Sequence, residues 1–333
     1  MRKNRSAQAT LFELPPPRLH PAPRRPEHVA LAAELPPDIR LGGMTWTFPG
    51  WIGLVYAAGT SEKLLAAHGL AAYAQHPLLR TVELDRTYYE PLSALVLQGF
   101  AAQVPEDFSF FVKAHEDCVV RRFPLHPRYG PKRGQDNLSF LDPSYAERVV
   151  IEPLVEGLGQ RLGGLLFQFP PQDVSSPALF AQRLHVFLSR LPKGITYAVE
   201  LRNRELLTRE YGQALEAAGA IHCHSAWTAM PSIWAQARLI PPSARRPLLV
   251  RWLLRQDHRY EDAGVRYAPF NRLVEPDVDT REAIARLVVK AHAHGVPVVV
   301  LVDNKAEGCA PESIALLAQS IVQQLRGVDA DLA

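Results

Sequence analysis

The sequence has few cysteines and no long apolar run. Its three cysteines, in a chain of 333 residues, lie far apart and form no Cys-x-x-Cys pair. This pattern argues against a disulfide framework or a zinc ribbon and is typical of a reducing compartment. No stretch of about 18 apolar residues is present, and the N-terminus lacks the apolar core of a signal peptide. We therefore expect a cytoplasmic protein with no membrane partner.

A strong excess of charge of one sign is also missing, since the net charge is +3. Residues 1–28 hold six basic and two acidic side chains, so the rest of the chain is slightly acidic. Proline is frequent in this leader, as in LPPPRLHPAPRRP, and proline neither continues a helix nor donates to a sheet ladder. We predict that residues 1–38 form a basic, flexible and disordered N-terminal tail. Nucleic-acid binding by this tail is a weaker alternative to a solvated extension without a specific partner.

The sequence does contain a regular alternation of short, β-branched apolar runs with segments of helical period. The predicted strands are residues 39–46, 81–89, 108–114, 163–170, 196–202, 221–226, 247–253 and 296–304. Such alternation is typical of an α/β protein with a parallel sheet and crossover helices. Eight strands of this kind predict a single (β/α)8 TIM barrel. We place the barrel at residues 39–326, followed by a short C-terminal tail at 327–333.

Barrels of this kind carry their working residues at the C-terminal ends of the strands. Several predicted strands end here in charged or polar side chains, which are costly to bury together unless they are paired or used. The candidate site residues are Glu83, Tyr89, Lys113, Gln168, Glu200, Arg202, Arg251, Asp303 and Asn304, and Trp46 follows the first strand in an aromatic cluster. Two interpretations stay open: a functional pocket, and a structural ion-pair network that closes the barrel.

Metal and cofactor motifs are weak. His222 and His224 flank Cys223 on a predicted strand, so the two imidazoles share one face, as in some metal sites. No HExxH sequence or second spaced histidine pair accompanies them, and the glycine pairs lack the GxGxxG or GxxxxGK spacing of phosphate-binding loops. We therefore predict neither a metal nor a cofactor.

Seven short blocks follow one another in the order found in a known family. They are GGMTWTFPGWIGLVY, TVELDRTYYEP, FSFFVKA, GGLLFQFPP, YAVELRNR, LLVRW and VDNKAEGCAPES. On these motifs the chain resembles the YecE-like family, the domain of unknown function 72, over nearly all of residues 39–325. The resemblance implies a (β/α)8 fold and no particular activity, because the function of the family is unassigned. The matched positions are Trp46, Glu83, Tyr89, Lys113, Gln168, Glu200, Arg202, Arg251 and Asn304.

The chain departs from the family pattern at four places. The Thr-His pair that usually follows the lysine strand is not evident, and Leu253 and Leu254 replace a His-Gly pair after the arginine of the seventh strand. Asp303 stands where an Asn is usual, and Leu206 stands where a Trp is usual. These differences imply a modified pocket, so the substrate of other members is not carried over.

From these residues we hypothesise a metal-independent enzyme that acts on a small anionic ligand held by Lys113, Arg202 and Arg251. Glu200 is the expected general acid/base, because it shares a strand face with Arg202 and neighbouring cations can stabilise developing negative charge. Lys113 and Asp303 complete the expected catalytic group. Two alternatives are a divalent-metal phosphoesterase acting on nucleic acid and a ligand-binding protein without catalysis.

Overall fold

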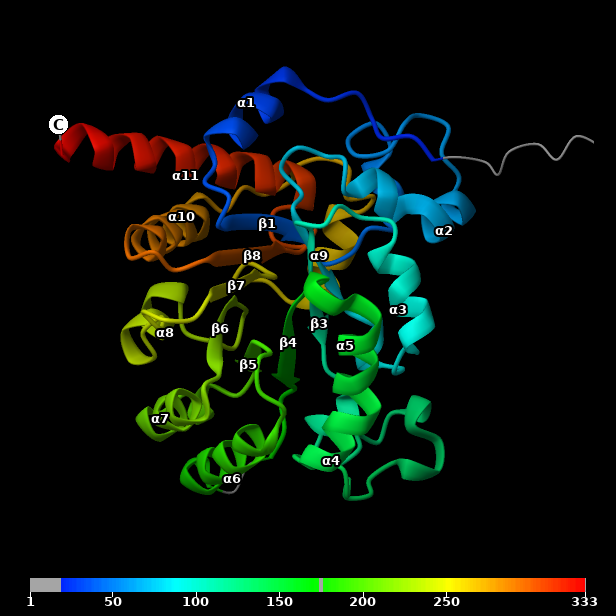
Figure 1. The fold of residues 1–333 in the computed structure, drawn as a ribbon, viewed down its shortest axis with the longest axis vertical. Coiled ribbons are helices and arrows are strands. Elements are labelled where there is room, and N and C mark those ends of the chain that lie inside the picture. Colours follow the sequence, from blue (N-terminus) through cyan, green and yellow to red (C-terminus); the bar gives the residue numbers. More distant parts are fainter. Residues whose placement is uncertain (1–18, 174–175, 333) are drawn as a thin grey trace, which may run out of the picture.

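Eight parallel strands close into a barrel in the order β1 to β8 in the computed structural model, which describes residues 19–173 and 176–332. Figure 1 shows the strands at the centre of the molecule with helices around them. The strands are β1 (Ile39–Gly43), β2 (Thr81–Leu84), β3 (Ser109–Lys113), β4 (Leu162–Phe169), β5 (Tyr197–Leu201), β6 (Ile221–Ala226), β7 (Leu248–Trp252) and β8 (Val298–Val302). Each predicted run contains one of these strands or, for β4, overlaps it in all but the first residue, so the predicted (β/α)8 barrel is confirmed.

The described part of the chain forms eleven α-helices. They are α1 (Pro26–Glu34), α2 (Glu62–Tyr73), α3 (Ala94–Ala101), α4 (Pro143–Tyr145), α5 (Glu152–Leu158), α6 (Pro177–Arg190), α7 (Arg209–Ala218), α8 (Ile233–Leu239), α9 (Tyr260–Tyr267), α10 (Val278–Ala293) and α11 (Ala310–Leu332). Polar side chains cap several of them. Ser176, for example, accepts a hydrogen bond from the backbone N–H of Leu179 at the start of α6. None of the helices in residues 19–173 and 176–332 is both long and apolar enough to cross a bilayer.

Apolar side chains from alternate strand positions fill the interior of the barrel. They are Phe111, Leu166, Ala198, Ile221, Cys223, Leu249, Val299 and Leu301. Gly164 on β4 makes room for the largest of them, because a Cβ atom at this position would lie 2.6 Å from the ring of Phe111. The glycine pair at the start of β4 therefore serves close packing of the barrel core. A second and larger core lies between the strands and the surrounding helices.

The N-terminal segment packs on the barrel from the first described residues onward, which differs from the flexible tail predicted for residues 1–38. Helix α1 begins at Pro26, where the missing N–H of proline costs nothing, and it lies beside α11 (Figure 1). Arg25 pairs with Glu312 of α11 at 3.0 Å. The proline content of residues 1–38 did not predict this helix, because these prolines stand before it, at its first residue or after its end. Residues 1–18 of the predicted tail lie outside the described residues.

Replacing Leu35 by alanine is expected to lower the free energy of unfolding by about 2 kcal/mol, because large-to-small changes at buried positions leave a cavity. The Leu35 side chain is only 6% exposed where α1 leads into β1. Val29 of α1 is 45% exposed, so Val29→Ala is a control that is expected to cost less than about 0.5 kcal/mol. Urea denaturation measures both values. Equal and small losses would show that the end of α1 does not pack on the barrel in solution.

Candidate functional site

A layer of polar side chains closes the barrel interior at the C-terminal ends of the strands. Residues paired across neighbouring parallel strands share a face of the sheet, and side chains two positions apart on one strand point the same way. The layer contains Glu83 of β2, Lys113 of β3, Gln168 of β4, Glu200 of β5, Ser225 of β6 and Arg251 of β7, with Asp303 directly after β8. The barrel mouth thus carries charges of both signs, as the sequence pattern predicts.

Arg251 is the centre of this layer and joins three strands. Its Nε and Nη2 donate to the two carboxylate oxygens of Glu83, each at 2.8 Å, and its Nη1 donates to Glu200 Oε2. All three side chains are buried. Two carboxylates and a guanidinium can lie in this interior because each offsets the desolvation of the other. The direct contact between Glu200 and a cation is the geometry expected from the sequence.

Arg202 pairs with Glu200 and leaves two of its donors unused. Its Nη2 lies 2.6 Å from Glu200 Oε1, an ion pair without the angles of a hydrogen bond. Its Nε and Nη1 are buried and have no hydrogen-bond partner among the described residues. Trp227 covers the guanidinium, with its ring centre 3.8 Å from Arg202 Cζ. A buried cation with unused donors is costly, and an anion would satisfy both its charge and its hydrogen bonds.

The two glutamates that share Arg251 have pKa values shifted in opposite directions. Burial raises the pKa of Glu83 to about 7, although Arg251 acts in the opposite direction. Burial also acts to raise the pKa of Glu200, but Arg202 and Arg251 outweigh it and hold that pKa below the ordinary value. Near neutral pH, Glu200 is therefore ionised, whereas Glu83 is partly protonated. Such separation of two carboxyl groups is what paired acid and base catalysis requires.

Lys113 and Asp303 lie in the layer but bind partners of their own. Lys113 Nζ lies 2.8 Å from Asp85 Oδ1 and 4.1 Å from the ring centre of Tyr88. Asp303 Oδ1 accepts a hydrogen bond from the backbone N–H of Lys305 at 2.8 Å. Burial raises the pKa of Asp303. Both groups belong to the barrel mouth, and each is paired locally rather than with the two glutamates.

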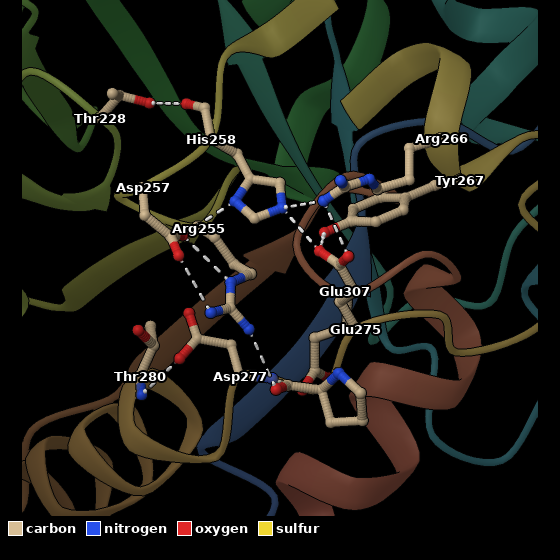
Figure 2. Close-up of polar contacts among 11 residues, drawn as sticks. Thr228, Arg255, Asp257, His258, Arg266, Tyr267, Glu275, Asp277, Thr280 and Glu307 are labelled. Carbon is tan, nitrogen blue, oxygen red and sulfur yellow. Dashed lines mark hydrogen bonds and ion pairs between the residues drawn. The ribbon is translucent and has the colours of Figure 1, made fainter. Parts of the chain in front are cut away.

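The segment after β7 is held in place by a cluster of charged side chains, which Figure 2 shows. His258 Nδ1 lies 2.8 Å from Asp257 Oδ1, and its Nε2 lies 2.6 Å from Glu275 Oε2. Arg266 Nη1 and the Tyr267 hydroxyl, both on α9, donate to Glu275 at 2.8 and 2.9 Å. These bonds fix α9 to the segment between α9 and α10.

Trp227, which packs on helix α9, forms a cover over Arg202. The ring centre of Trp227 lies 5.8 Å from that of Tyr260 at the start of α9. The Thr228 hydroxyl donates to the carbonyl of His258 at 2.6 Å, which joins the loop after β6 to the cluster in Figure 2. Arg202 is only 7% exposed. A ligand therefore reaches the unused donors of Arg202 only when this cover moves.

Three candidates from the sequence lie away from the centre of the layer. The Trp46 ring packs on Phe100 of α3, with ring centres 5.2 Å apart. Asn304 Oδ1 accepts a hydrogen bond from Trp51 Nε1 at 3.0 Å. Tyr89 is 58% exposed after β2. The structure thus gives Trp46 and Asn304 packing roles and does not bring them to the charged side chains.

His222 and His224 face the helices outside the barrel. His222 Nδ1 lies 2.9 Å from the Tyr211 hydroxyl of α7, and its Nε2 lies 3.2 Å from Gln236 Oε1 of α8. Burial lowers the pKa of His222 to about 4 and that of His224 to about 3. In the described part of the chain, no three His, Cys, Asp or Glu side chains are grouped as metal ligands. The sheet separates the two histidines from the glutamates of the polar layer.

Sequence reasoning misses three residues near the site. Ser225 takes the interior face by the same alternation that turns the neighbouring histidines outward, so this pattern is a signal for it. His115 stands two residues after Lys113 and is buried, with its Nδ1 2.8 Å from the Tyr145 hydroxyl. Trp227 lies in a loop, where no periodic pattern indicates its contact with the site.

Comparison with known proteins identifies the relatives of the chain. The family model described as "Protein of unknown function DUF72" matches residues 40–332. A DUF72 family protein from Enterococcus faecalis is similar in structure, with a TM-score of 0.56, 17% identity, and coverage of 86% of this chain and 95% of that chain. One from Thermotoga maritima has a TM-score of 0.56 and 20% identity, with coverage of 86% and 99%. At these identities the likeness shows the fold alone. None of the curated proteins matches the chain.

Proposed function

Since the chain belongs to the DUF72 family, whose function is unknown, we propose from its own side chains that it is a metal-independent enzyme acting on a small anionic ligand. The ligand binds at the C-terminal face of the barrel. The observation that carries this proposal is the buried Arg202 guanidinium, whose Nε and Nη1 have no partner in the described part of the chain. Lys113 contributes a further positive charge to the same layer.

An ion-pair network alone does not account for Arg202. In a purely structural network each buried donor is expected to have an acceptor, because an unsatisfied donor costs about 1 to 3 kcal/mol. Arg251 follows this rule, since its Nε, Nη1 and Nη2 all contact carboxylate oxygens. Arg202 does not, although it is also buried. A phosphate or carboxylate would complete its hydrogen bonds and balance its charge.

The glutamates beside this position supply the acid/base chemistry of the proposal. Glu200, the acid/base candidate from the sequence, is ionised and able to accept a proton. Glu83, with a pKa of about 7, holds a proton that it can donate near neutral pH. Together the two carboxyl groups form an acid and a base on either side of Arg251. The guanidinium groups stabilise negative charge that develops on the ligand.

A ligand-binding protein without catalysis is the second candidate function. It is favoured by the contacts of Arg251, which hold both glutamates in place in a way that suits binding as well as proton transfer. Conversion of a bound anion distinguishes the two functions. The divalent-metal phosphoesterase that acts on nucleic acid stays an alternative from the sequence, and elemental analysis of the purified protein tests it.

Inorganic phosphate is expected to raise the Tm of the wild-type protein by a few degrees, because a ligand that binds only the folded state stabilises it. Arg202→Gln is expected to remove this shift, since the amide keeps hydrogen-bonding groups but no charge. Lys113→Met is expected to weaken it. Arg204→Gln changes an exposed arginine two residues further on and serves as the matched control, with an unchanged shift. Thermal melts in rising phosphate and malonate concentrations measure these values.

The same series separates an enzyme from the alternatives. A Tm that is equal in every anion would contradict the anion site and favour the structural ion-pair interpretation. An anion that raises the Tm can then be incubated with the protein and its conversion followed by mass spectrometry. Glu200→Gln is expected to keep the Tm shift and to lose the conversion, because the amide cannot act as a base. Binding without conversion by the wild type would leave the non-catalytic function.

A further inference from the structure

A cavity of about 920 Å³ lies outside the barrel between α7 and α8. Its floor is formed by β6, with His222 and His224 on the outer face of the strand and Ile221 at its start. Helix α7 forms one wall, and the end of α8 with residues 239–248 forms the other. Figure 1 shows the two helices on the outside of β6, and this volume is in the range of small-molecule sites. The sheet separates this cavity from the polar layer inside the barrel.

The charged residues that line this cavity are mainly arginines. Arg209, Arg245 and Arg246 line it together with a single carboxylate, Glu216. Within residues 19–173 and 176–332, none of the three guanidinium groups makes an ion pair or a side-chain hydrogen bond. Arg209 and Arg245 are exposed and Arg246 is half-buried, and three arginines that line one cavity without acceptors favour an anionic occupant.

The remaining wall of the cavity is apolar. Leu215 of α7, Ile240 after α8 and Leu248 of β7 are buried and line it. His224 on the floor is 1% exposed, its Nε2 lies 3.2 Å from the carbonyl of Ile240, and its Nδ1 has no partner in the described part of the chain. A carbonyl only accepts hydrogen bonds, so the neutral ring donates from Nε2 and keeps Nδ1 as an acceptor. The apolar wall suits the body of an organic ligand.

We propose that this cavity is a second binding site, for a small organic anion with an apolar or aromatic body. The anionic head contacts Arg245 and Arg246, with Arg209 at the α7 wall. The body packs between Leu215 and Ile240. This site is independent of the function proposed for the barrel mouth, because it lies on the opposite face of β6 and shares no residue with the polar layer.

Fluorescence titration with anilinonaphthalene sulfonate, an aromatic anion, tests this site. The wild-type protein is expected to bind one molecule saturably. Arg245→Gln with Arg246→Gln is expected to weaken binding about tenfold, the loss of roughly one charge-assisted contact. The matched control, Arg190→Gln with Arg204→Gln, changes two exposed arginines that do not line the cavity and is expected to bind as the wild type does. Equal affinity in the two double variants, or no saturable binding, would overturn the proposal.

Two competitors then identify the head group of the ligand. Displacement of the probe by adenosine monophosphate indicates a phosphate head, and displacement by octanoate indicates a carboxylate head on an apolar chain. Failure of both to displace the probe would also overturn the proposal, since each carries the predicted combination of charge and apolar body. The Arg202→Gln variant is expected to bind the probe normally. If phosphate then does not raise the Tm of Arg202→Gln, this loss concerns the barrel mouth alone and not the cavity outside the barrel.

Discussion

Replacing Arg251 by methionine is expected to lower the free energy of unfolding by about 3 to 5 kcal/mol, the usual cost of breaking a buried ion pair from one side. The variant would leave the carboxylates of Glu83 and Glu200 in the barrel interior without the guanidinium that contacts both. The exposed fraction of Arg251 is 2%, so water cannot take its place without a change in packing. Urea denaturation near neutral pH measures the loss.

Arg255 provides the matched control for this variant. Its side chain is 29% exposed and pairs at 3.1 Å with Asp257, which is itself 64% exposed. Such surface pairs contribute about 0 to 1 kcal/mol, so Arg255→Met is expected to change stability little. A loss of free energy of unfolding below about 1 kcal/mol in Arg251→Met would show that water enters the barrel interior or that the glutamate side chains leave it. It would also remove the basis for treating the three residues as one network.

Neutralising Glu83 is expected to restore part of the stability lost with Arg251. In a variant that combines Arg251→Met with Glu83→Gln, Glu200 keeps its ion pair with Arg202, so no unpaired carboxylate remains in the barrel interior. Stability that returns in this combined variant attributes the loss to uncompensated charge. Stability that stays low attributes it to lost packing of the arginine side chain. Arg202→Gln differs from these variants because its expected effect depends on the anion that is present.

The barrel could be predicted because its strands are buried on both faces. The run VPVVVLV, for example, has no polar position and contains β8 (Val298–Val302). Helix α1 could not be predicted from composition, which counts the prolines of the leader without regard to where they stand. Pro26 is at the first helical residue, the one place in a helix that favours proline. The position of Pro26, rather than the number of prolines in the leader, determines the local structure there.

The orientation of the site residues could be predicted better than their partners. Strand alternation placed Glu200 and Arg251 in the interior, because this periodicity is a local property of the chain. Lys113 instead binds Asp85, a residue beyond the end of β2 whose position depends on the folded loop. The raised pKa of Glu83 follows from burial, which no sequence pattern measures. Trp227 covers Arg202 through a loop contact of the same non-local kind.

The two interpretations that the sequence leaves open apply to different residues of one layer. Arg251 has the complete set of acceptors that a structural ion pair needs. Arg202, which pairs with the other carboxylate oxygen of Glu200, has unused donors beneath Trp227. We propose that the first arginine holds the glutamates in place so that the second can bind the ligand. The protonation state of Glu83 then decides whether Glu83 and Glu200 can act as an acid and a base.

The stability of the protein is expected to carry a contribution from Glu83 that is lost as the pH rises. The pKa of Glu83 is about 7 in the folded protein, against an ordinary value of 4.5 in an unfolded chain. Below pH 4.5 the carboxyl group is protonated in both states, and its contribution is fully present. Between these two values only the folded protein keeps the proton, so the contribution falls as the pH rises through 7. The expected total loss is about 3 kcal/mol.

The matched variant Glu83→Gln isolates this contribution. Buried histidines act in the opposite direction, because burial lowers the pKa of His28, His76 and His222 and their contribution is gained as the pH rises. The histidine contributions are the same in both proteins. They therefore cancel when the free energy of unfolding of Glu83→Gln is subtracted from that of the wild type. We expect this difference to fall by about 3 kcal/mol between about pH 4 and pH 8, as measured by urea denaturation at each pH. A constant difference would mean that the pKa of Glu83 is the same in the folded and unfolded protein, and Glu83 would then have no proton to donate near neutral pH.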